Sequence, residues 1–299
     1  MYYVYVVLNN VYGDLVSKIK LAELFYSCQG EGRYMGVPSV FLRTFGCNFT
    51  CGGFGMPKGE ISSERDVIAT TSKSFTSYGD LPLVSSGCDS YASWDVRFKH
   101  LSPLVETNSI VESIMEMLPH KKWVDEHLVI TGGEPLLGWQ RAYPDLLDHS
   151  EMYQLKELTF ETNGTQKLSP EFEEYLFQEW TRFGRDREKL TFSVSPKLSV
   201  SGETWKDAIL PDIILQYQSI GHTYLKFVIA SKEDAEEADL AIFEYRKAGF
   251  DGSVYLMPVG GTESVYAMNN RTVAELALKR GLRYSDRLQV PLFKNAWGT

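Results

Sequence analysis

The sequence predicts an α/β fold in which parallel strands form either a barrel or a doubly wound sheet. Short apolar runs end abruptly in polar or glycine-rich residues, and segments with helical spacing lie between them. Such alternation is typical of parallel strands joined by right-handed crossovers, with function carried by the loops that follow the strands. The six apolar runs that we interpret as buried strands are 39–44, 127–131, 158–161, 190–194, 224–229 and 254–257.

Helix-start signals lie between these predicted strands. Asn108 and Ser169 each precede an apolar pattern with helical spacing. Ser231 is followed three residues later by Asp234, the spacing of a capping box, and a similar signal begins at Thr272. We therefore expect helices to begin after Asn108, Ser169, Ser231 and Thr272.

Composition excludes several classes of protein. The chain has 299 residues, of which 43% are hydrophobic and 23% charged, enough to close one large core or two small ones. Its 39 acidic and 30 basic side chains give a net charge of −9, which disfavours nonspecific binding to nucleic acids. No run reaches the ~20 apolar residues of a membrane helix, and residues 1–8 lack the basic start and cleavage site of a signal peptide. We expect one globular, cytoplasmic unit that contacts neither nucleic acid nor membrane directly.

Residues 52–87 interrupt the alternation of strands and helices. The stretch holds six glycines, seven serines and two prolines, and it has little sustained periodicity. Such a composition is typical of a long loop or a loosely ordered insertion.

The cysteines are candidate ligands, because four of them are too few for a disulfide scaffold in so long a chain. Cys47 and Cys51 are separated by three residues, and Cys88 follows after 36 more. Three thiolates could hold an iron–sulfur cluster. Two other interpretations stay open on spacing alone. The cysteines could be buried without any ligand, or all four, including Cys28, could form a structural zinc site.

Polar residues follow several of the predicted strands. Residues 131–135, Thr-Gly-Gly-Glu-Pro, offer open backbone amides and a carboxylate, although a glycine-rich turn on its own usually serves only to reverse the chain. Residues 161–164 supply hydroxyl, amide and carboxylate groups, and residues 195–197 supply a hydroxyl and a cation. Because the carboxyl ends of parallel strands meet at one edge, these groups predict one site there.

Two further features give weaker signals. Residues 29–36 look like a dinucleotide-binding loop, but Met35 stands where the third glycine belongs and no helical pattern follows. The sequence contains no phosphate-loop, zinc-protease or serine-hydrolase motif, and its five histidines lack metal-ligand spacing. Arg43, on an apolar strand, is either a surface group or a partly buried partner for a carboxylate, and its position alone favours the first.

Taken together, these segments resemble the radical S-adenosylmethionine superfamily and, more narrowly, the 7-carboxy-7-deazaguanine synthase family. Members of that family carry a segment similar to residues 25–32, then a strand similar to residues 38–43, and then a glycine–cysteine pair like Gly46-Cys47. All three occur here in the same order. Later matches bring the resemblance to roughly residues 22–299, and they are 131–135, 161–164, 195–197, 225–228 and 257–260.

The cluster motif departs from the family pattern at its third cysteine. Phe54 stands where that cysteine usually does. However, the family motif continues as Cys-Asp-Thr followed by an aromatic residue and a tryptophan. Residues 88–94 reproduce this continuation with Ser90 in place of the threonine. The resemblance therefore makes Cys88 the third ligand and makes residues 52–86 an insertion inside the motif.

The resemblance implies a partial (β/α)6-type barrel of parallel strands, in a single radical S-adenosylmethionine domain over residues 1–299 from which residues 52–86 loop out. It implies a carbon–nitrogen lyase of 7-deazapurine (queuosine-type) biosynthesis that converts 6-carboxy-5,6,7,8-tetrahydropterin to 7-carboxy-7-deazaguanine with loss of ammonia. In this chemistry an electron cleaves S-adenosylmethionine to a deoxyadenosyl radical, which takes a hydrogen from the carboxylated carbon. The implied partners are the pterin substrate, an electron donor such as flavodoxin, and a second copy in a homodimer.

Site residues follow from the resemblance in the same way, and no side chain is assigned as catalytic because the cofactor carries the radical chemistry. The implied [4Fe-4S] ligands are Cys47, Cys51 and Cys88, and Ser90 would bind Mg²⁺. Those implied to bind S-adenosylmethionine are Gly87, Asp89, Gly132, Gly133, Glu134 (to the methionine ammonium), Ser195, Pro196, Lys197, Met257, Pro258, Val259 and Gly260. Those implied to bind the pterin are Cys28, Gln29, Gly30, Glu31, Arg43 (to the carboxylate), Thr131 and Asn163.

Two alternatives remain at this point. One is another radical enzyme, such as an activase acting on a protein glycine, although that function does not explain residues 29–31 or Arg43. The other is a homologue without enzymatic activity that binds zinc or a pterin.

Overall fold

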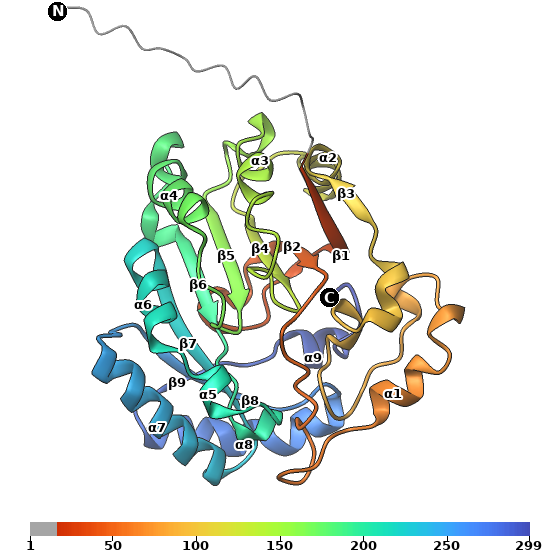
Figure 1. Ribbon diagram of the computed structural model, residues 1–299, viewed down its shortest axis with the longest axis vertical. Helices are drawn as coiled ribbons and strands as arrows, with labels where there is room; N and C mark the ends of the chain where they lie inside the picture. Colours follow the sequence, from red (N-terminus) through yellow and green to blue (C-terminus); the bar gives the residue numbers. More distant parts are fainter. Residues whose placement is uncertain (1–16) are drawn as a thin grey trace, which may run out of the picture.

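The computed structural model describes residues 17–299, and within them it contains one nine-stranded sheet (Figure 1). The strand order is β3-β1-β2-β4-β5-β6-β7-β8-β9. Strand β1 is antiparallel to β2 and β3, whereas β2 and β4–β9 run parallel to one another. The strands are β1 (Lys18–Cys28), β2 (Pro38–Thr44), β3 (Leu104–Glu106), β4 (His127–Gly132), β5 (Glu157–Thr162), β6 (Leu190–Val194), β7 (His222–Ile229), β8 (Val254–Pro258) and β9 (Arg283–Tyr284).

Helices connect the parallel strands, and α4, α6 and α7 lie beside β5–β7 (Figure 1). The helices are α1 (Glu64–Ala69), α2 (Thr107–Met117), α3 (Tyr143–Leu147), α4 (Pro170–Gln178), α5 (Trp205–Ala208), α6 (Pro211–Ile220), α7 (Lys232–Ala248), α8 (Glu263–Lys279) and α9 (Gln289–Phe293). The α/β class and the mostly parallel sheet that the sequence predicts are therefore confirmed.

All six predicted strands are present, as β2 and β4–β8. Ser169 and Ser231 cap α4 and α7 as expected, because their hydroxyls accept hydrogen bonds from the backbone N–H of Phe172 and Asp234. The helix start predicted after Thr272 is wrong, since Thr272 is an exposed residue inside α8. Glu275, the second residue of that signal, instead pairs with Arg271 at 2.9 Å.

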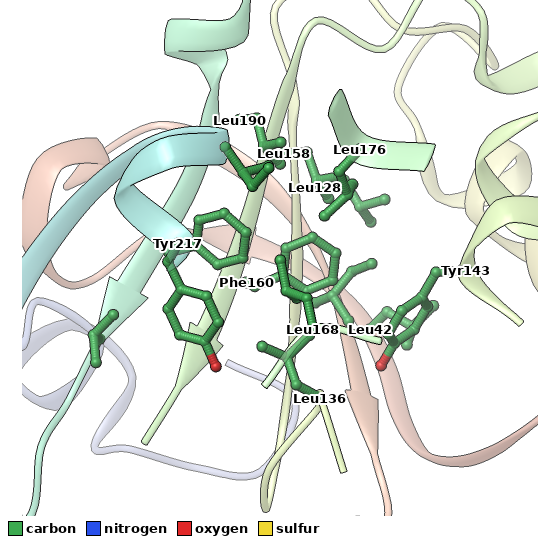
Figure 2. Packing of buried hydrophobic residues seen from close by; sticks show 14 of the residues in the cluster. Leu42, Leu128, Leu136, Tyr143, Leu158, Phe160, Leu168, Leu176, Leu190 and Tyr217 are labelled. Atoms are coloured by element: carbon green, nitrogen blue, oxygen red, sulfur yellow. The ribbon is translucent and has the colours of Figure 1, made fainter. Parts of the chain in front are cut away.

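Side chains alternate along the parallel strands, so that one face of the sheet is apolar and packs against the helices. Figure 2 shows Leu128, Leu158, Phe160 and Leu190 on this face in contact with residues of the surrounding segments, including Tyr217 of α6. The Phe160 ring lies 5.7 Å from that of Phe192 and 5.6 Å from that of Tyr143, measured between centroids. This cluster is the main hydrophobic core.

The opposite face of the same strands carries polar side chains. Arg43 lies beside Thr131 in the register of β2 and β4, and Glu161 lies beside Ser193 in that of β5 and β6. Lys226, in the middle of β7, is 4% exposed. These residues alternate along the strands with residues of the hydrophobic core. The same alternation therefore places apolar side chains on one face of the sheet and polar side chains on the other.

The segment from residue 52 to residue 87 is more ordered than its composition predicts. It contains α1, and its residues Ala69, Tyr78, Leu81 and Val84 form a second hydrophobic cluster with neighbours that include Ala22 of β1. The expectation of a loosely ordered insertion is therefore wrong, because scattered apolar residues in a glycine- and serine-rich segment are enough to build a small core.

Hydrogen bonds join the two ends of this segment. The N–H of Gly87 donates to the carbonyl of Phe54 at 2.7 Å, and the hydroxyls of Ser62 and Ser86 lie 2.8 Å apart. The Ser62 N–H donates to the carbonyl of Gly52 at 2.8 Å. Residues that are far apart in sequence are thus brought back to the same place, next to Cys51 and Cys88.

The sheet has two free edges, at β3 and β9, within the described residues. Its hydrogen bonds therefore do not confirm a partial barrel. No helix in residues 17–299 combines the length and apolar character needed to cross a membrane. Residues 1–8, which we expect to carry no targeting signal, lie outside the part of the chain that the structure describes.

Candidate active site

A cavity of about 260 Å³ opens on the polar face of the sheet. Residues after the carboxyl ends of the parallel strands line it, as the strand order predicts. The cavity also receives residues from the beginning and the end of the described chain. The segments that line it include 28–31, 87–90, 131–133, 161–163, 259–261 and 295–299, together with Met257 and single residues from 41–54 and 193–197.

Three of the four thiols, those of Cys47, Cys51 and Cys88, meet at this cavity in one hydrophobic cluster with Phe49 and Phe54. Burial raises the pKa of Cys47 to about 12 and raises the pKa values of Cys51 and Cys88 as well. A buried thiolate therefore needs positive charge beside it, and the irons of a cluster supply such charge. The donor set fits an iron–sulfur cluster.

The alternative of a four-cysteine zinc site does not agree with the structure. Zinc needs four ligands around a single ion. Among residues 17–299, no three His, Cys, Asp or Glu side chains converge closely enough to hold one metal ion. Cys28 stands apart from the other thiols at the end of β1, although it also lines the cavity.

The glycine-rich turn after β4 packs directly on the cysteine loop. A Cβ atom at Gly133 would lie 2.7 Å from the Cβ of Cys47 and 2.4 Å from the carbonyl oxygen of Gly46. The next residue, Glu134, donates its backbone N–H to that same carbonyl at 2.7 Å. The turn therefore holds the first cysteine in place, and only glycine fits at residue 133.

Glu134 does not itself line the cavity, although its partners Thr162 and Asn163 do. It is fully buried and accepts hydrogen bonds from the Thr162 hydroxyl at 2.8 Å and from the backbone N–H groups of Asn163 at 2.7 Å and Leu136 at 3.1 Å. Burial raises its pKa to about 7 despite these bonds. These three donors occupy the carboxylate within the described residues, and its contact with the methionine ammonium stays a prediction.

Glu31 is occupied by protein groups. Its carboxylate pairs with Lys226, with Arg287 at 3.2 Å and with the Gln289 side-chain amide at 2.9 Å. Burial on its own would raise its pKa, but the charges of Lys226 and Arg287 lower the pKa to about 2. The carboxylate that we expect to meet the pterin is thus already neutralised within the protein.

Glu161 is the carboxylate with weaker protein partners. It lines the cavity and accepts hydrogen bonds from the neutral groups Gln29, at 3.0 Å, and Thr131, at 3.1 Å. Nearby, the Asn163 side-chain amide donates to Asn48 at 3.0 Å, next to Cys47. The predicted residues Gln29 and Thr131 are thus brought together around Glu161, the carboxylate of the 161–164 segment, which the resemblance gave no role.

Arg43 is partly buried, with a side chain that is 17% exposed, so the surface interpretation is wrong. Its Nε donates to Glu23 of β1 at 2.8 Å, and its Nη1 donates to the Ser90 hydroxyl at 3.2 Å. A carboxylate on the neighbouring antiparallel strand thus stabilises the guanidinium before any ligand binds. Within residues 17–299, its Nη2 has no hydrogen-bond partner.

The remaining predicted residues divide into two groups. Lys197, whose ammonium donates to the Ser195 hydroxyl at 3.0 Å, lines the cavity. Pro196 and Pro258 alternate with lining residues and do not line it. The other predicted residues that line the cavity are Cys28, Gly30, Gly87, Asp89, Gly132, Met257, Val259 and Gly260.

Comparison with known proteins decides the family. No protein-family model matches the chain. The chain is 31% identical to the 7-carboxy-7-deazaguanine synthase of Halobacterium salinarum, over 93% of this chain and 91% of that protein. It belongs to the 7-carboxy-7-deazaguanine synthase family. The enzyme of the same name from Pyrobaculum aerophilum is 27% identical over 94% of this chain and 97% of its own length.

The fold agrees with that family. The crystal structure of QueE from Escherichia coli matches with a TM-score of 0.52 and 18% identity, over 90% of this chain and 93% of that one. The full-length matches to 7-carboxy-7-deazaguanine synthases confirm the narrower resemblance and disfavour an activase that acts on a protein glycine.

Sequence reasoning missed several charged and polar residues at the cavity of this family member. The sequence did contain a signal for Lys226, because a lysine inside an otherwise apolar strand indicates a buried charge with a partner. Arg287 and Gln289 had none, because they follow no predicted strand, and neither had Glu23, which pairs with Arg43 but does not line the cavity. Residues 295–299 also line the cavity, and the ring of Trp297 lies 5.3 Å from that of Tyr78 in the 52–87 segment.

Proposed function

We propose that this chain converts 6-carboxy-5,6,7,8-tetrahydropterin to 7-carboxy-7-deazaguanine with loss of ammonia. Family membership supports the activity, and the arrangement of the cavity supports the chemistry. The observation that carries the proposal is that three thiols and the Arg43–Ser90 pair line the same cavity. A radical generator and an anion-binding group are needed side by side for this reaction.

In this proposal Cys47, Cys51 and Cys88 hold a [4Fe-4S] cluster and leave one iron open for S-adenosylmethionine. When bound, the cluster and S-adenosylmethionine supply the one-electron chemistry that removes a hydrogen atom from the substrate. The backbone of Gly132 and Gly133 and the side chains of Ser195 and Lys197 line the adjacent part of the cavity. These groups orient the cofactor, and the aromatic ring of Phe54 helps to exclude water.

The substrate carboxylate binds to the Nη2 of Arg43, which Glu23 and Ser90 orient through the other two nitrogens. Ser90 supplies an oxygen ligand for Mg²⁺, a cation that prefers oxygen and keeps several waters. Glu161 accepts hydrogen bonds from the N–H groups of the pterin ring, since its hydrogen-bond partners in the protein are neutral. The protein thus binds both ends of the substrate and fixes the reacting carbon.

The partial barrel, the single domain over 1–299, the homodimer and an electron donor such as flavodoxin belong to the same proposal. The six central parallel strands, β2 and β4–β8, support the barrel. Support for the other three comes from the resemblance to the family.

The direct test is anaerobic turnover of the reconstituted protein with reductant, S-adenosylmethionine, magnesium and the pterin. We expect a carboxylated deazaguanine in the product, detected by mass spectrometry. If protein with an intact cluster forms only deoxyadenosine, the substrate assignment fails and a broader radical-enzyme function replaces it.

The cluster assignment is tested separately by iron content. The wild-type protein should hold about four irons per chain after reconstitution, and Cys88→Ala should lose iron, colour and activity. Cys28→Ala is the matched control, because this thiol lines the same cavity away from the other three. Loss of iron in Cys28→Ala with a full cluster in Cys88→Ala would overturn the ligand set.

The carboxylate contact is tested at Arg43. Arg43→Ala should weaken use of the pterin by roughly 30- to 150-fold, which corresponds to the loss of a charge-assisted hydrogen bond of about 2–3 kcal/mol. Because this change also leaves Glu23 unpaired, the double variant Glu23→Gln/Arg43→Ala is needed, with Glu23→Gln alone as the control. We expect the loss in both Arg43 variants and not in Glu23→Gln. If all three variants lost the same share of pterin turnover, the role of Arg43 would be limited to its ion pair with Glu23.

A further inference from the structure

Arg287 joins three parts of the cavity wall that are far apart in sequence. It lies between β9 and α9 and is 8% exposed. Its Nη2 donates to Asp89 at 2.6 Å, its Nε donates to Glu31 at 3.2 Å, and its Nη1 donates to the carbonyl of Gly260. All three nitrogens of the guanidinium are therefore engaged by different segments.

Each of these partners lies in a segment with a different proposed role at the cavity. Asp89 lies between Cys88 and Ser90, Glu31 follows the segment that contains Gln29 and Gly30, and Gly260 ends the turn after β8. In the proposed function, these are the cluster and magnesium loop, the substrate segment and the cofactor turn. A lysine cannot replace this arrangement, because its ammonium is a single point charge whereas the guanidinium is a planar fork.

The charges at this position alternate. Asp89, Arg287, Glu31 and Lys226 form a chain of ion pairs with no net charge. Burial on its own would raise the pKa of Glu31, but Lys226 and Arg287 beside it lower that pKa. Without Arg287, the carboxylates of Glu31 and Asp89 would lose the cation that joins them, and their mutual repulsion would drive the two loops apart.

We propose that Arg287 is a positioning residue that holds the cluster loop at a fixed distance from the substrate segment, and so couples cofactor cleavage to product formation. This inference rests on the proposed function. Arg287 is not a catalytic residue, because its nitrogens are occupied by Asp89, Glu31 and Gly260. Its effect is exerted through the two loops that it joins.

The experiment compares Arg287→Lys and Arg287→Met with the wild-type protein after anaerobic reconstitution. Coupling is measured as the ratio of deoxyadenosine to deazaguanine product, and binding is measured by calorimetry with 6-carboxy-5,6,7,8-tetrahydropterin. Because the substrate segment is displaced when the fork is lost, we expect Arg287→Lys to weaken pterin binding and to raise the ratio, each by about tenfold, with iron content retained. Arg287→Met should show larger effects of the same sign.

Arg280→Lys is the matched control. Arg280 also pairs with a carboxylate, that of Asp239 at 3.0 Å, but it follows α8 and does not line the cavity. This variant should keep the wild-type ratio and affinity. If Arg287→Met does not fold, Arg287→Lys decides the question.

The outcomes separate this inference from the proposed function. Wild-type protein that makes no deazaguanine would overturn the proposed function. Wild-type protein that makes it, together with folded Arg287 variants that keep both the ratio and the pterin affinity, would overturn the positioning role. A lower melting temperature with an unchanged ratio would show that Arg287 is merely structural.

Discussion

The two faces of the central strands have the same backbone and opposite chemistry. On one face, Phe160 and its neighbours pack under the helices and contact only apolar groups. On the other face, the adjacent residues Thr159 and Glu161 meet hydroxyl, imidazole and amide groups. The comparison teaches that burial has opposite consequences on the two faces. Apolar burial stabilises the fold directly, whereas polar burial is tolerated only where every charge has a partner.

The largest effect on stability is expected on the apolar face. Phe160→Ala removes a fully buried ring that contacts Tyr143, Phe172 and Phe192, so it should lower the free energy of unfolding by about 3–5 kcal/mol. Activity per folded molecule should be unchanged, because the ring faces away from the cavity. Urea denaturation gives the first value and turnover at low temperature the second. A loss below ~1 kcal/mol would show that neighbouring side chains move into the cavity left by the ring.

A smaller effect, dependent on pH, is expected at the amino end of the polar face. His127 is fully buried, its Nε2 lies 2.8 Å from the Thr159 hydroxyl, and its ring centroid lies 4.3 Å from that of Tyr34. Burial, together with the charge of Lys189, lowers the pKa of His127 to about 3. The imidazole therefore takes up a proton near pH 6.5 in the unfolded chain but stays neutral there in the folded chain. The free energy of unfolding falls as the pH falls below 6.5.

The expected loss from this histidine between pH 7 and pH 5 is about 2 kcal/mol. It is measured as the difference in pH dependence of unfolding between wild type and His127→Gln. Glu134, whose raised pKa acts in the opposite sense over this range, is present in both proteins and cancels in the difference. Identical pH dependence in the two proteins would contradict a neutral, buried imidazole.

The smallest effect on stability is expected from a polar residue at the cavity. Thr131→Val removes only the hydrogen bond from Thr131 to Glu161, so it should lower the free energy of unfolding by about 1 kcal/mol. It should nevertheless raise the KM for the pterin, since Glu161 loses a group that orients it. Denaturation and steady-state kinetics measure the two quantities. If Thr131→Val lowered the free energy of unfolding as much as Phe160→Ala does, the two faces would not differ in their contribution to stability.

The strands and the approximate place of the site could be predicted from the sequence. The apolar runs of β2 and β4–β8 are local patterns, and parallel strands bring their carboxyl ends to one edge whatever their other contacts are. The resemblance to the family then assigned residues to roles, and most of those residues line one cavity. The antiparallel β1 and β3 were missed, because partly exposed strands carry a weaker apolar pattern.

What only the tertiary structure decided is which charges pair. Glu31 meets Lys226 from 195 residues away and Arg287 from 256 residues away, and Arg43 meets Glu23 across an antiparallel pair that no crossover rule predicts. The partners of the Glu134 carboxylate were decided in the same way, since the Thr162 hydroxyl and the Asn163 backbone N–H come from the end of β5. Local periodicity determines which face of a strand a residue occupies. Its electrostatic partners depend on contacts between distant segments, which exist only once the chain has folded.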